Sequence, residues 1–167
     1  TERNPITTLY WQDFDDIQAS GSGAGISGNK FGGLTVQSVD NGTDHNSYTI
    51  ENGALNMSLH YKYQGLDAGC LRFVVDGSEN WTDYEISADF KQNVPDGEKW
   101  VWTGFGLRYN GENSNNSMKV YLNYLKNSGS DSRLSFKYID GTGNSNRLGW
   151  DTCTLNTNEW YRLTAAV

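Results

Sequence analysis

The sequence predicts an all-β fold, a two-sheet antiparallel β-sandwich. Large apolar residues recur at every second position in many short segments, which is the period of a strand with one buried face. Clusters such as "NVPDGEK" and "DGTGNSN" separate these segments, and their Gly, Asn, Asp and Ser residues favour turns. No segment has the apolar period of a helix of normal length, so strands and turns account for the chain.

The length and composition fit a single domain over residues 1–167. The chain has 167 residues, of which 36% are hydrophobic, and no stretch has the composition of an interdomain linker. Aromatic residues make up 13% of the chain, with 6 Trp and 10 Tyr. This content exceeds what a core needs, so we expect some of the rings to line a binding surface.

Two segments in the first half of the chain are predicted to be strands. In residues 54–63 ("ALNMSLHYKY") the apolar positions from Leu55 to Tyr63 share one face, and residues 70–75 ("CLRFVV") follow the same period. Residues 19–28 ("ASGSGAGISG") are predicted to be a flexible loop. They lack the Gly-Lys-Ser/Thr and the following helix that a phosphate-binding loop needs.

Four later segments are predicted to form one antiparallel sheet with a single apolar face. They cover residues 84–90, 104–109, 118–124 and 133–139, and residues 159–167 give a final strand. The polar face would have a bare floor at two glycines, Gly104 and Gly106, where a flat ligand could approach the backbone. The expected members of this polar face are Glu85, Ser87, Asp89, Lys91, Trp102, Arg108, Lys119, Tyr121, Asn123 and Lys137.

The charge balance restricts the class of partner. The formal net charge is −7, whereas binding to a phosphate backbone or to an anionic membrane surface relies on clustered Lys and Arg. We therefore expect no nucleic acid and no membrane as partner, and a neutral ligand suits the balance better. No apolar run approaches the roughly 20 residues of a membrane span.

The start of the chain and its cysteines bear on where the protein works. The opening "TERNPITT" reads like the start of a mature protein or of an excised module, so we expect a secreted, extracellular location. Cys70 and Cys153 fit neither a CxxC nor a zinc pattern. Two alternatives stay open for them, one disulfide or two separate buried thiols.

Six segments follow one another from about Leu9 to Val167: "YWQDFDDI", "ENGALNMSL", "WTDYEISADF", "GFGLRYN", "MKVYLNYL" and "NEWYRLTAAV". In their order and spacing the chain resembles the concanavalin-A-like jelly-roll superfamily, and within it the laminin-G-like branch that includes many bacterial carbohydrate-binding modules. Members usually continue past the "WYRL" strand, whereas this chain stops at Val167. The domain is then expected to lack its last strands, as a fragment, a proteolysed piece or a module with a reshuffled strand order.

The resemblance implies a jelly roll of two packed, curved sheets, with sugar held on the concave face or at the loops on its rim. It implies that Arg108 and Tyr121, on neighbouring strands, point into this face. It also implies a structural Ca²⁺ near the first strand, where Asp13, Asp15 and Asp16 of "QDFDDI" are the candidate ligands. Calcium prefers such clustered oxygens, and the alternative is a solvated acidic turn.

Aromatic and hydrogen-bonding side chains are the candidate sugar contacts. Trp100 and Trp102 are two residues apart on a strand and so face the same way, as rings that stack on sugars or that cap the core. Arg108 offers a planar fork of donors to sugar hydroxyls. Its alternative role is to pair with Glu85 or Asp89 on a neighbouring strand.

Four further residues complete the expected site. Tyr121, Asn123 and Glu85 would add hydrogen bonds, and Trp150, in the segment "RLGWDTC", is expected to be an exposed ring on a loop. The other three tryptophans are interpreted as structural. Trp81 would seal the sandwich, and Trp11 and Trp160 would lie in the core or at its edge.

The sequence supports a catalytic role for the carboxylates Glu85 and Asp89 less well than it supports a binding surface. Glycosidases use two carboxylates about 5–9.5 Å apart, whereas Glu85 and Asp89, four residues apart on one strand, would lie roughly 13 Å apart. The segment "YEISADFK" also lacks the Glu-x-Asp-x-x-Glu pattern of laminarinase-type members of the superfamily.

The sequence therefore predicts a non-catalytic carbohydrate-binding module that recognises a plant or host glycan, tethered to a larger enzyme or adhesin. Two alternatives stay open: a glycoside hydrolase of the same superfamily, and a protein-binding laminin-G-like adhesin domain. Two carboxylates at glycosidase distance would favour the first, and a flat apolar patch without an aromatic groove would favour the second.

Overall fold

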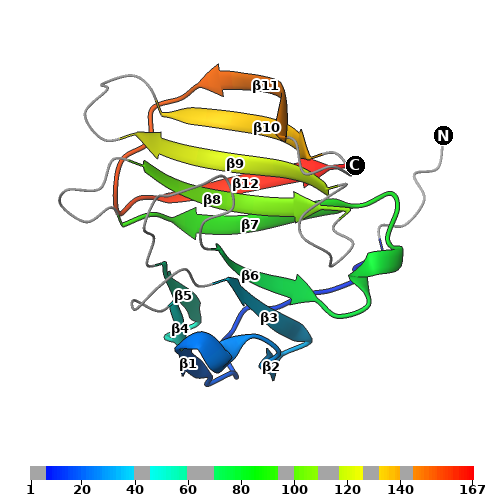
Figure 1. Ribbon diagram of the computed structural model, residues 1–167, viewed down its shortest axis with the longest axis vertical. Coiled ribbons are helices and arrows are strands. Elements are labelled where there is room, and N and C mark those ends of the chain that lie inside the picture. The colour runs from blue at the N-terminus through cyan, green and yellow to red at the C-terminus, as the bar shows by residue number, and fades with distance from the viewer. Residues whose placement is uncertain are drawn as a thin grey trace. The chain divides into compact units, whose positions relative to one another are not determined.

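A computed structural model describes residues 7–39, 46–59, 70–93, 100–108, 117–125, 132–139 and 145–167. These residues form twelve strands and two short 3-10 turns, and every strand pair is antiparallel (Figure 1). The predicted all-β antiparallel fold is confirmed to this extent. The chain divides into two compact units, one ending at Ser78 and the other starting at Glu79.

The first unit contains two three-stranded sheets, with the orders β1-β4-β5 and β2-β3-β6. The 3-10 turn η1 (Ala24–Ile26) follows β1 inside the segment predicted to be a loop. The strands are β1 (Ser20–Ser22), β2 (Lys30–Phe31), β3 (Leu34–Val39), β4 (Ser47–Glu51), β5 (Ala54–Ser58) and β6 (Cys70–Val75).

Side chains from both sheets of the first unit share one core. Val36 of β3 and Tyr48 of β4 are buried together with Leu71 of β6. The rings of Phe31 and Phe73 pack against Tyr48, with centroids 5.4 and 5.5 Å from it. Tilted and edge-on contacts of this kind add to the apolar burial that holds the unit together.

A two-residue hairpin turn connects β4 to β5. Glu51 pairs with Ala54, and the intervening Asn52 and Gly53 have φ angles of 53° and 69°. Positive φ at both central residues defines the type I′ turn, for which Asn-Gly is the preferred sequence. Asp15 approaches this turn so closely that a Cβ added to Gly53 would lie 2.5 Å from the Asp15 Oδ1.

The strand predicted over residues 54–63 is confirmed as β5, which ends at Ser58. Its expected apolar face is not buried at the described end, because Met57 and Leu59 are 43% and 48% exposed. The prediction that Tyr61 and Tyr63 are core residues lies outside the described residues.

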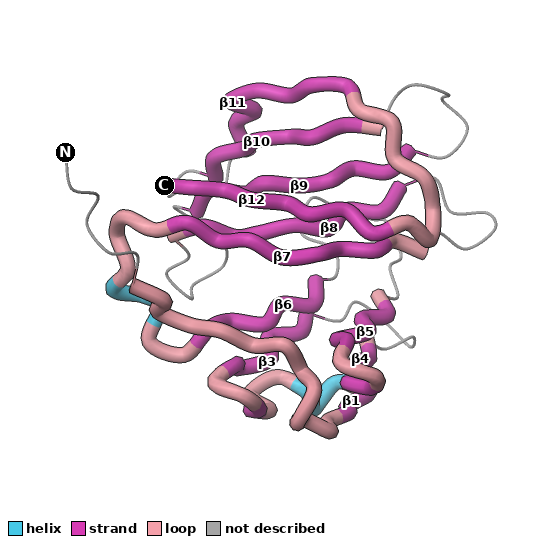
Figure 2. The backbone as a smooth tube through the Cα atoms, turned by 180° about the vertical axis from the view of Figure 1, so that it is seen from behind, coloured by secondary structure: helices cyan, strands magenta, loops and turns pink. Residues whose placement is uncertain are grey.

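The second unit contains a four-stranded sheet with the order β11-β10-β9-β8 and a two-stranded sheet formed by β12 and β7 (Figure 2). The 3-10 turn η2 (Ser78–Asn80) precedes β7. The strands are β7 (Glu85–Lys91), β8 (Trp100–Leu107), β9 (Ser117–Leu125), β10 (Arg133–Ile139), β11 (Ser145–Thr152) and β12 (Trp160–Ala166).

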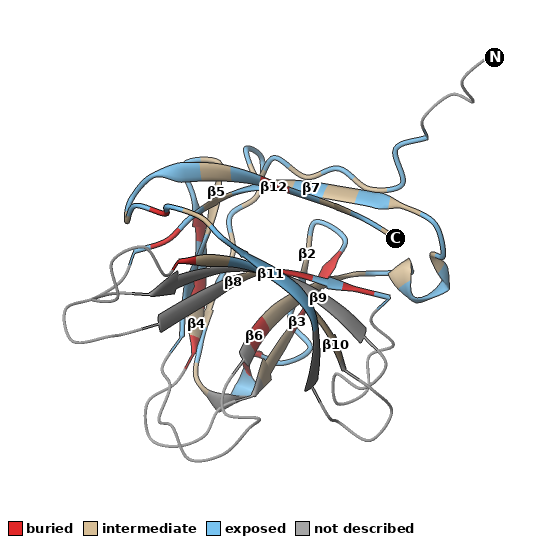
Figure 3. Ribbon diagram, turned by 90° about the horizontal axis from the view of Figure 1, so that it is seen from above, coloured by how far each residue is buried: buried red, intermediate tan, exposed pale blue. Residues whose placement is uncertain are grey.

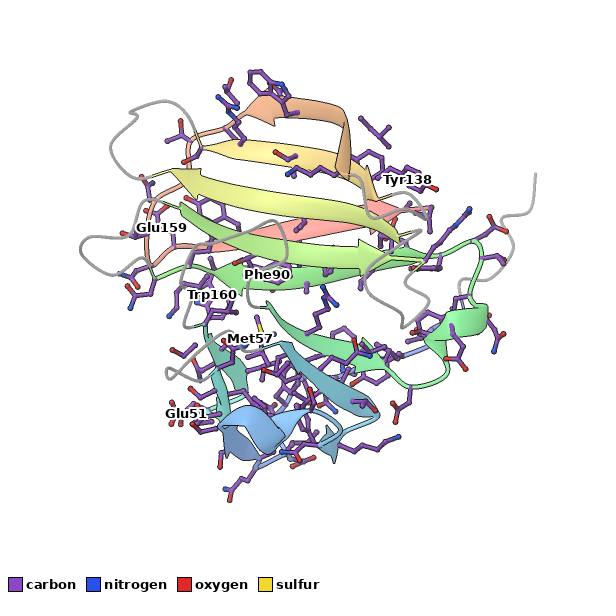
Figure 4. All side chains as sticks on the ribbon, viewed as in Figure 1. Glu51, Met57, Phe90, Tyr138, Glu159 and Trp160 are labelled. Atoms are coloured by element: carbon purple, nitrogen blue, oxygen red, sulfur yellow. The ribbon has the colours of Figure 1, made fainter. Side chains whose placement is uncertain are left out.

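The core of the second unit joins its two sheets. Phe105 and Leu107 of β8 are buried with Leu163 of β12, and Phe90 of β7, labelled in Figure 4, packs against them. The rings of Phe90 and Phe105 meet edge to face, with centroids 5.3 Å apart. Figure 3 shows the alternation of exposed and partly buried residues along β7 and β12 that this packing produces.

The predicted four-stranded sheet is corrected in its membership. The segment 84–90 does not pair with 104–109, because β7 pairs along its whole length with β12, and β11 takes the fourth place beside β10. The ladder extends past both ends, through Tyr84 with Val167 and through Asn158 with Gln92. Strand pairing between segments so far apart in sequence leaves no local signal in either segment.

The Asn-Gly turn provides a test of the first unit. Gly53→Ala should lower the free energy of unfolding by about 1–2 kcal/mol, because alanine is strained at positive φ and its Cβ would collide with Asp15. Urea unfolding followed by tyrosine and tryptophan fluorescence measures this change. Gly149→Ala is the matched control, since a Cβ there meets nothing within 4 Å, and an equal loss in both variants would contradict the turn geometry.

Candidate functional site

The four-stranded sheet of the second unit has a face opposite the core, called here the far face. Phe105 and Leu107 lie on the core side, and successive residues of a strand alternate between faces. Antiparallel pairing then assigns the positions of the neighbouring strands. The far-face positions are Trp100, Trp102, Gly104, Gly106, Lys119, Tyr121, Asn123, Arg133, Ser135, Lys137, Arg147, Trp150 and Thr152.

The far-face positions fall into rows that cross the strands. The aromatic row comprises Gly104, Tyr121, Ser135 and Trp150. The row on one side of it comprises Trp102, Asn123, Arg133 and Thr152, and the basic row on the other side comprises Gly106, Lys119, Lys137 and Arg147. The backbone register therefore assigns the positions of five predicted sugar contacts to one face of one sheet, namely Trp100, Trp102, Tyr121, Asn123 and Trp150.

Trp150 is exposed, as predicted, but it lies on strand β11 and not on a loop. The guanidinium carbon of Arg133 lies 4.3 Å from the centroid of its ring, a cation–π contact that fixes both side chains. The Nε of Arg133 is buried and has no hydrogen-bond partner among the described residues. Arg133 was not predicted as a site residue, although it alternates with the apolar Leu134 and Phe136.

The bare floor predicted at the glycines is present at Gly106. This residue is exposed, and a Cβ added to it would meet nothing within 4 Å. By contrast, Ser135 in the aromatic row is buried. Among these two positions, the far face is therefore open at Gly106, within the basic row, and covered at Ser135.

Arg108 lies just past the end of β8, with a φ of 49° that takes it out of the strand. Its backbone N–H donates to the Tyr84 hydroxyl at 2.8 Å, and its Nη2 lies 3.8 Å from the Asp83 Oδ1. The alternative in which Arg108 pairs with Asp89 is wrong, because Asp89 binds Arg162. Arg108 remains exposed at the end of the sheet, outside the rows.

Glu85 is also displaced from the expected group. It is the first residue of β7 and belongs to the β12-β7 sheet, opposite Ala166. Glu85 and Asp89 are too far apart along β7 to act as a catalytic pair, and neither residue lies in the sheet of Tyr121 and Asn123.

The exposed face of β7 and β12 is a ladder of cross-strand pairs. Arg162 Nε and Nη2 each donate to a carboxylate oxygen of Asp89 at 2.7 Å, and the hydroxyls of Ser87 and Thr164 are 3.0 Å apart. Directly opposite residues of antiparallel strands stabilise a sheet through such pairs. The polar side of this sheet is thus explained by pairing within the sheet.

Two tryptophans predicted to be structural are exposed. Trp160, labelled in Figure 4, is 58% exposed at the start of β12, where the Lys91 Nζ lies 5.0 Å from its ring centroid. Trp11 is 76% exposed. Trp81 is partly buried and meets the ring of Tyr84 edge to face at 5.7 Å, in line with its structural interpretation.

The aspartates near the start of the chain do not form a metal-binding group in the described residues. No three His, Cys, Asp or Glu side chains gather there as metal ligands would. The Asp13 Oδ1 instead accepts the backbone N–H of Asp15 at 3.3 Å, and Asp16 adds no third ligand. The calcium site stays a prediction that the donor set does not support.

The thiol of Cys153 is free and half-buried. Burial is the largest influence on it and raises its pKa. A thiol whose pKa is raised is a poor nucleophile, so Cys153 has the character of a packing residue. The side chain of Cys70 lies outside the described residues.

Comparisons of the chain with family models, with curated proteins and with solved structures found no match. In the described residues, no helix is long and apolar enough to cross a membrane. Function therefore has to be argued from the surfaces themselves.

The Asp89–Arg162 pair predicts a pH effect. The hydrogen bonds from Arg162 lower the pKa of Asp89 below its ordinary value of 3.8, so the pair stabilises the fold above pH 3.8 and less as the pH falls through the lowered pKa. A carboxyl ¹³C NMR titration should show the Asp89 midpoint below 3.8. Arg162→Gln should move it up, while Asp76, held by Thr35 and Lys30, stays unchanged; an unmoved Asp89 midpoint would contradict the pair.

Proposed function

We propose that the far face binds a carbohydrate without cleaving it. The observation that carries this proposal is the register of β8 to β11, which gathers Trp102, Tyr121, Asn123 and Trp150 in adjacent rows. Aromatic rings stack on the C–H faces of sugar rings, and amide and hydroxyl groups exchange hydrogen bonds with sugar hydroxyls. This combination suits a hydroxylated ligand that also has apolar faces.

The size of the far face suits a chain of several sugars. Neighbouring strands are about 4.8 Å apart, so the three steps from β8 to β11 span roughly 14 Å. Trp102 and Trp150 stand near the two ends of this span, on the first and last strands of the sheet. A poly- or oligosaccharide that lies across the strands would meet both ends of the surface.

The composition of the far face supports binding over hydrolysis. None of its strand positions is Asp or Glu, whereas glycoside hydrolysis in most families needs two carboxylates about 5–9.5 Å apart. Asp89 is engaged by Arg162, and Glu85 belongs to the other sheet. The far-face positions of the described strands thus offer neither the acid nor the nucleophile.

The same proposal extends to the fold and the setting of the protein. The core shared by the two sheets of the second unit supports a β-sandwich of the jelly-roll type. A surface that only binds is most useful when it is tethered to a catalytic or adhesive partner, so we place the module outside the cell, in a larger enzyme or adhesin.

Substitution of Trp150 tests the site. Trp150→Ala should weaken binding about tenfold, the loss expected for one aromatic stacking contact. Native affinity electrophoresis through gels that contain neutral or acidic polysaccharides measures the change. Trp160→Ala is the matched control, because Trp160 is comparably exposed, at 58% against 48%, but lies on the other sheet.

Three outcomes separate the alternatives. Equal retardation of the wild type and Trp160→Ala, with weaker retardation of Trp150→Ala and no reducing sugar released, supports the proposal. Equal retardation of wild type and Trp150→Ala would contradict the far-face site. Failure of every polysaccharide to retard the wild type would contradict carbohydrate binding and favour a protein partner.

A further inference from the structure

The outer edge of β5 is the least protected strand edge of the first unit. In the sheet order β1-β4-β5, no described strand pairs with the side of β5 that faces away from β4. Natural proteins protect such edges with very short strands or with charged side chains. The other edge strands of this unit follow that rule, because β1 and β2 have three and two residues and β6 carries Arg72. By contrast, β5 has five residues without a charge or a proline, so its edge is open to pairing.

The hairpin register directs the backbone groups of alternate β5 residues to this outer edge. The residues that flank a two-residue hairpin turn form a hydrogen-bonded pair, so the next pair, Ile50 with Leu55, is not hydrogen-bonded. The Ile50 N–H confirms this assignment, because it donates away from β5 to the Ala19 carbonyl at 2.8 Å. The N–H and C=O groups of Leu55, and of Met57 two residues later, therefore point to the outer edge of β5.

The side chains of the same residues belong to an apolar stripe that is open to solvent. Leu55 is directly opposite Ile50, and Met57 is directly opposite Tyr48. Because Ile50 and Tyr48 are buried, the stripe lies on the face of the sheet that contains the core. Leu59 follows at the same period of two residues, and both Leu59 and Met57, which is labelled in Figure 4, are exposed. The apolar face of the sheet thus continues beyond the core at β5.

The pattern of residues 55–59 reads the same in both directions. The sequence Leu-Asn-Met-Ser-Leu has apolar residues at its centre and at its two ends, with one polar residue between each. In an antiparallel pair of two such segments, Leu55 would be opposite Leu59 of a second copy, and Met57 would be opposite itself. These are also the positions whose backbone groups point to the outer edge, so side chains and backbone favour the same register. A strand from an unrelated partner would not require this symmetry.

We propose that two copies of the chain pair through β5 about a two-fold axis at Met57. Each hydrogen-bonded pair of an antiparallel ladder exchanges two bonds, so this register would satisfy the outward backbone groups of both copies. A two-fold axis perpendicular to the sheet keeps equivalent faces on the same side, so the two apolar stripes would form one surface. Each copy has a net charge of −7, whereas residues 52–59 carry no charge. The edge of β5 is therefore a place where two acidic copies can meet without repulsion between facing side chains.

The pairing should be weak, and it does not depend on the proposed carbohydrate binding. Five residues per copy bury less surface than the roughly 1,200–2,000 Å² of a stable interface. We therefore expect a dissociation constant on the order of 0.1 mM. A dimer would carry two far faces, and two weak sites that bind one polysaccharide chain together hold it more tightly than one site does.

Sedimentation velocity over a concentration range of about 10 μM to 1 mM tests the proposal. The wild type should shift from monomer to dimer over this range. Met57→Lys and Met57→Glu should each stay monomeric, because each places two like charges directly opposite each other. An equimolar mixture of these two variants should dimerise again, because this register places position 57 opposite itself. Leu148→Lys is the matched control, since Leu148 is an exposed apolar residue of another strand, and it should dimerise like the wild type.

Amide hydrogen exchange measured by NMR tests the register without any substitution. With a dissociation constant on the order of 0.1 mM, about four-fifths of the chains are paired at about 1 mM. Exchange of the Leu55 and Met57 amides should then be about fourfold slower at the higher concentration than at the lower one. The Asn56 amide already bonds within the sheet through its pair with Thr49, so its exchange should change little.

Dimerisation of the wild type that both Met57 variants lose and their mixture regains supports the proposal. A wild type that stays monomeric would overturn it, and so would a dimer that survives Met57→Lys, a mixture that stays monomeric, or assembly beyond the dimer. Thermal unfolding shows whether each variant is folded, and hydrogen exchange of the wild type decides the question if a variant is not. Carbohydrate binding by a monomeric wild type would overturn the pairing alone and keep the proposed function.

Discussion

The antiparallel register of β8, β9, β10 and β11 is the constraint on which the rest of the second unit depends. It sends Phe105, Leu107 and Phe136 to one side, where they build the core against β7 and β12. The same register fixes the composition of the opposite side, because a slip of one residue would exchange the two faces. Folding and surface chemistry are thus set by one choice of pairing.

The features of the second unit that could be predicted are those that depend on residues close together in the sequence. The period-two segments gave the strands β7, β9, β10 and β12 and the faces of their residues, since alternation is a local property. Pairing is not a local property, so the pairing of β7 with β12 could not be predicted from the residues of either strand. Trp150 was placed on a loop because Leu148, an extra residue between the partners of Phe136 and Lys137, interrupts the period of β11. The Asn52-Gly53 turn was not among the predictions, although its dipeptide is a strong local signal for a hairpin turn.

Two polar sheet faces in this unit obey different rules. On β7 and β12, Asp89 faces Arg162, and Lys91 lies over Trp160. The charged side chains of this face therefore interact with partners on the same sheet. On the far face, Lys119 and Lys137 are directly opposite each other. Alternation identifies both faces as polar, and only the pairing shows which residues of each face lie directly opposite each other.

This difference also limits what the net charge of a chain can say about its ligand. A charge of −7 argues against a polyanion only if the charges act together, whereas screening confines each to about 8 Å at physiological salt. Within that range of the basic row, the strand positions of the far face contribute cations and aromatic rings and no carboxylate. The local composition of a face therefore bears more directly on its ligand than the net charge of the whole chain does.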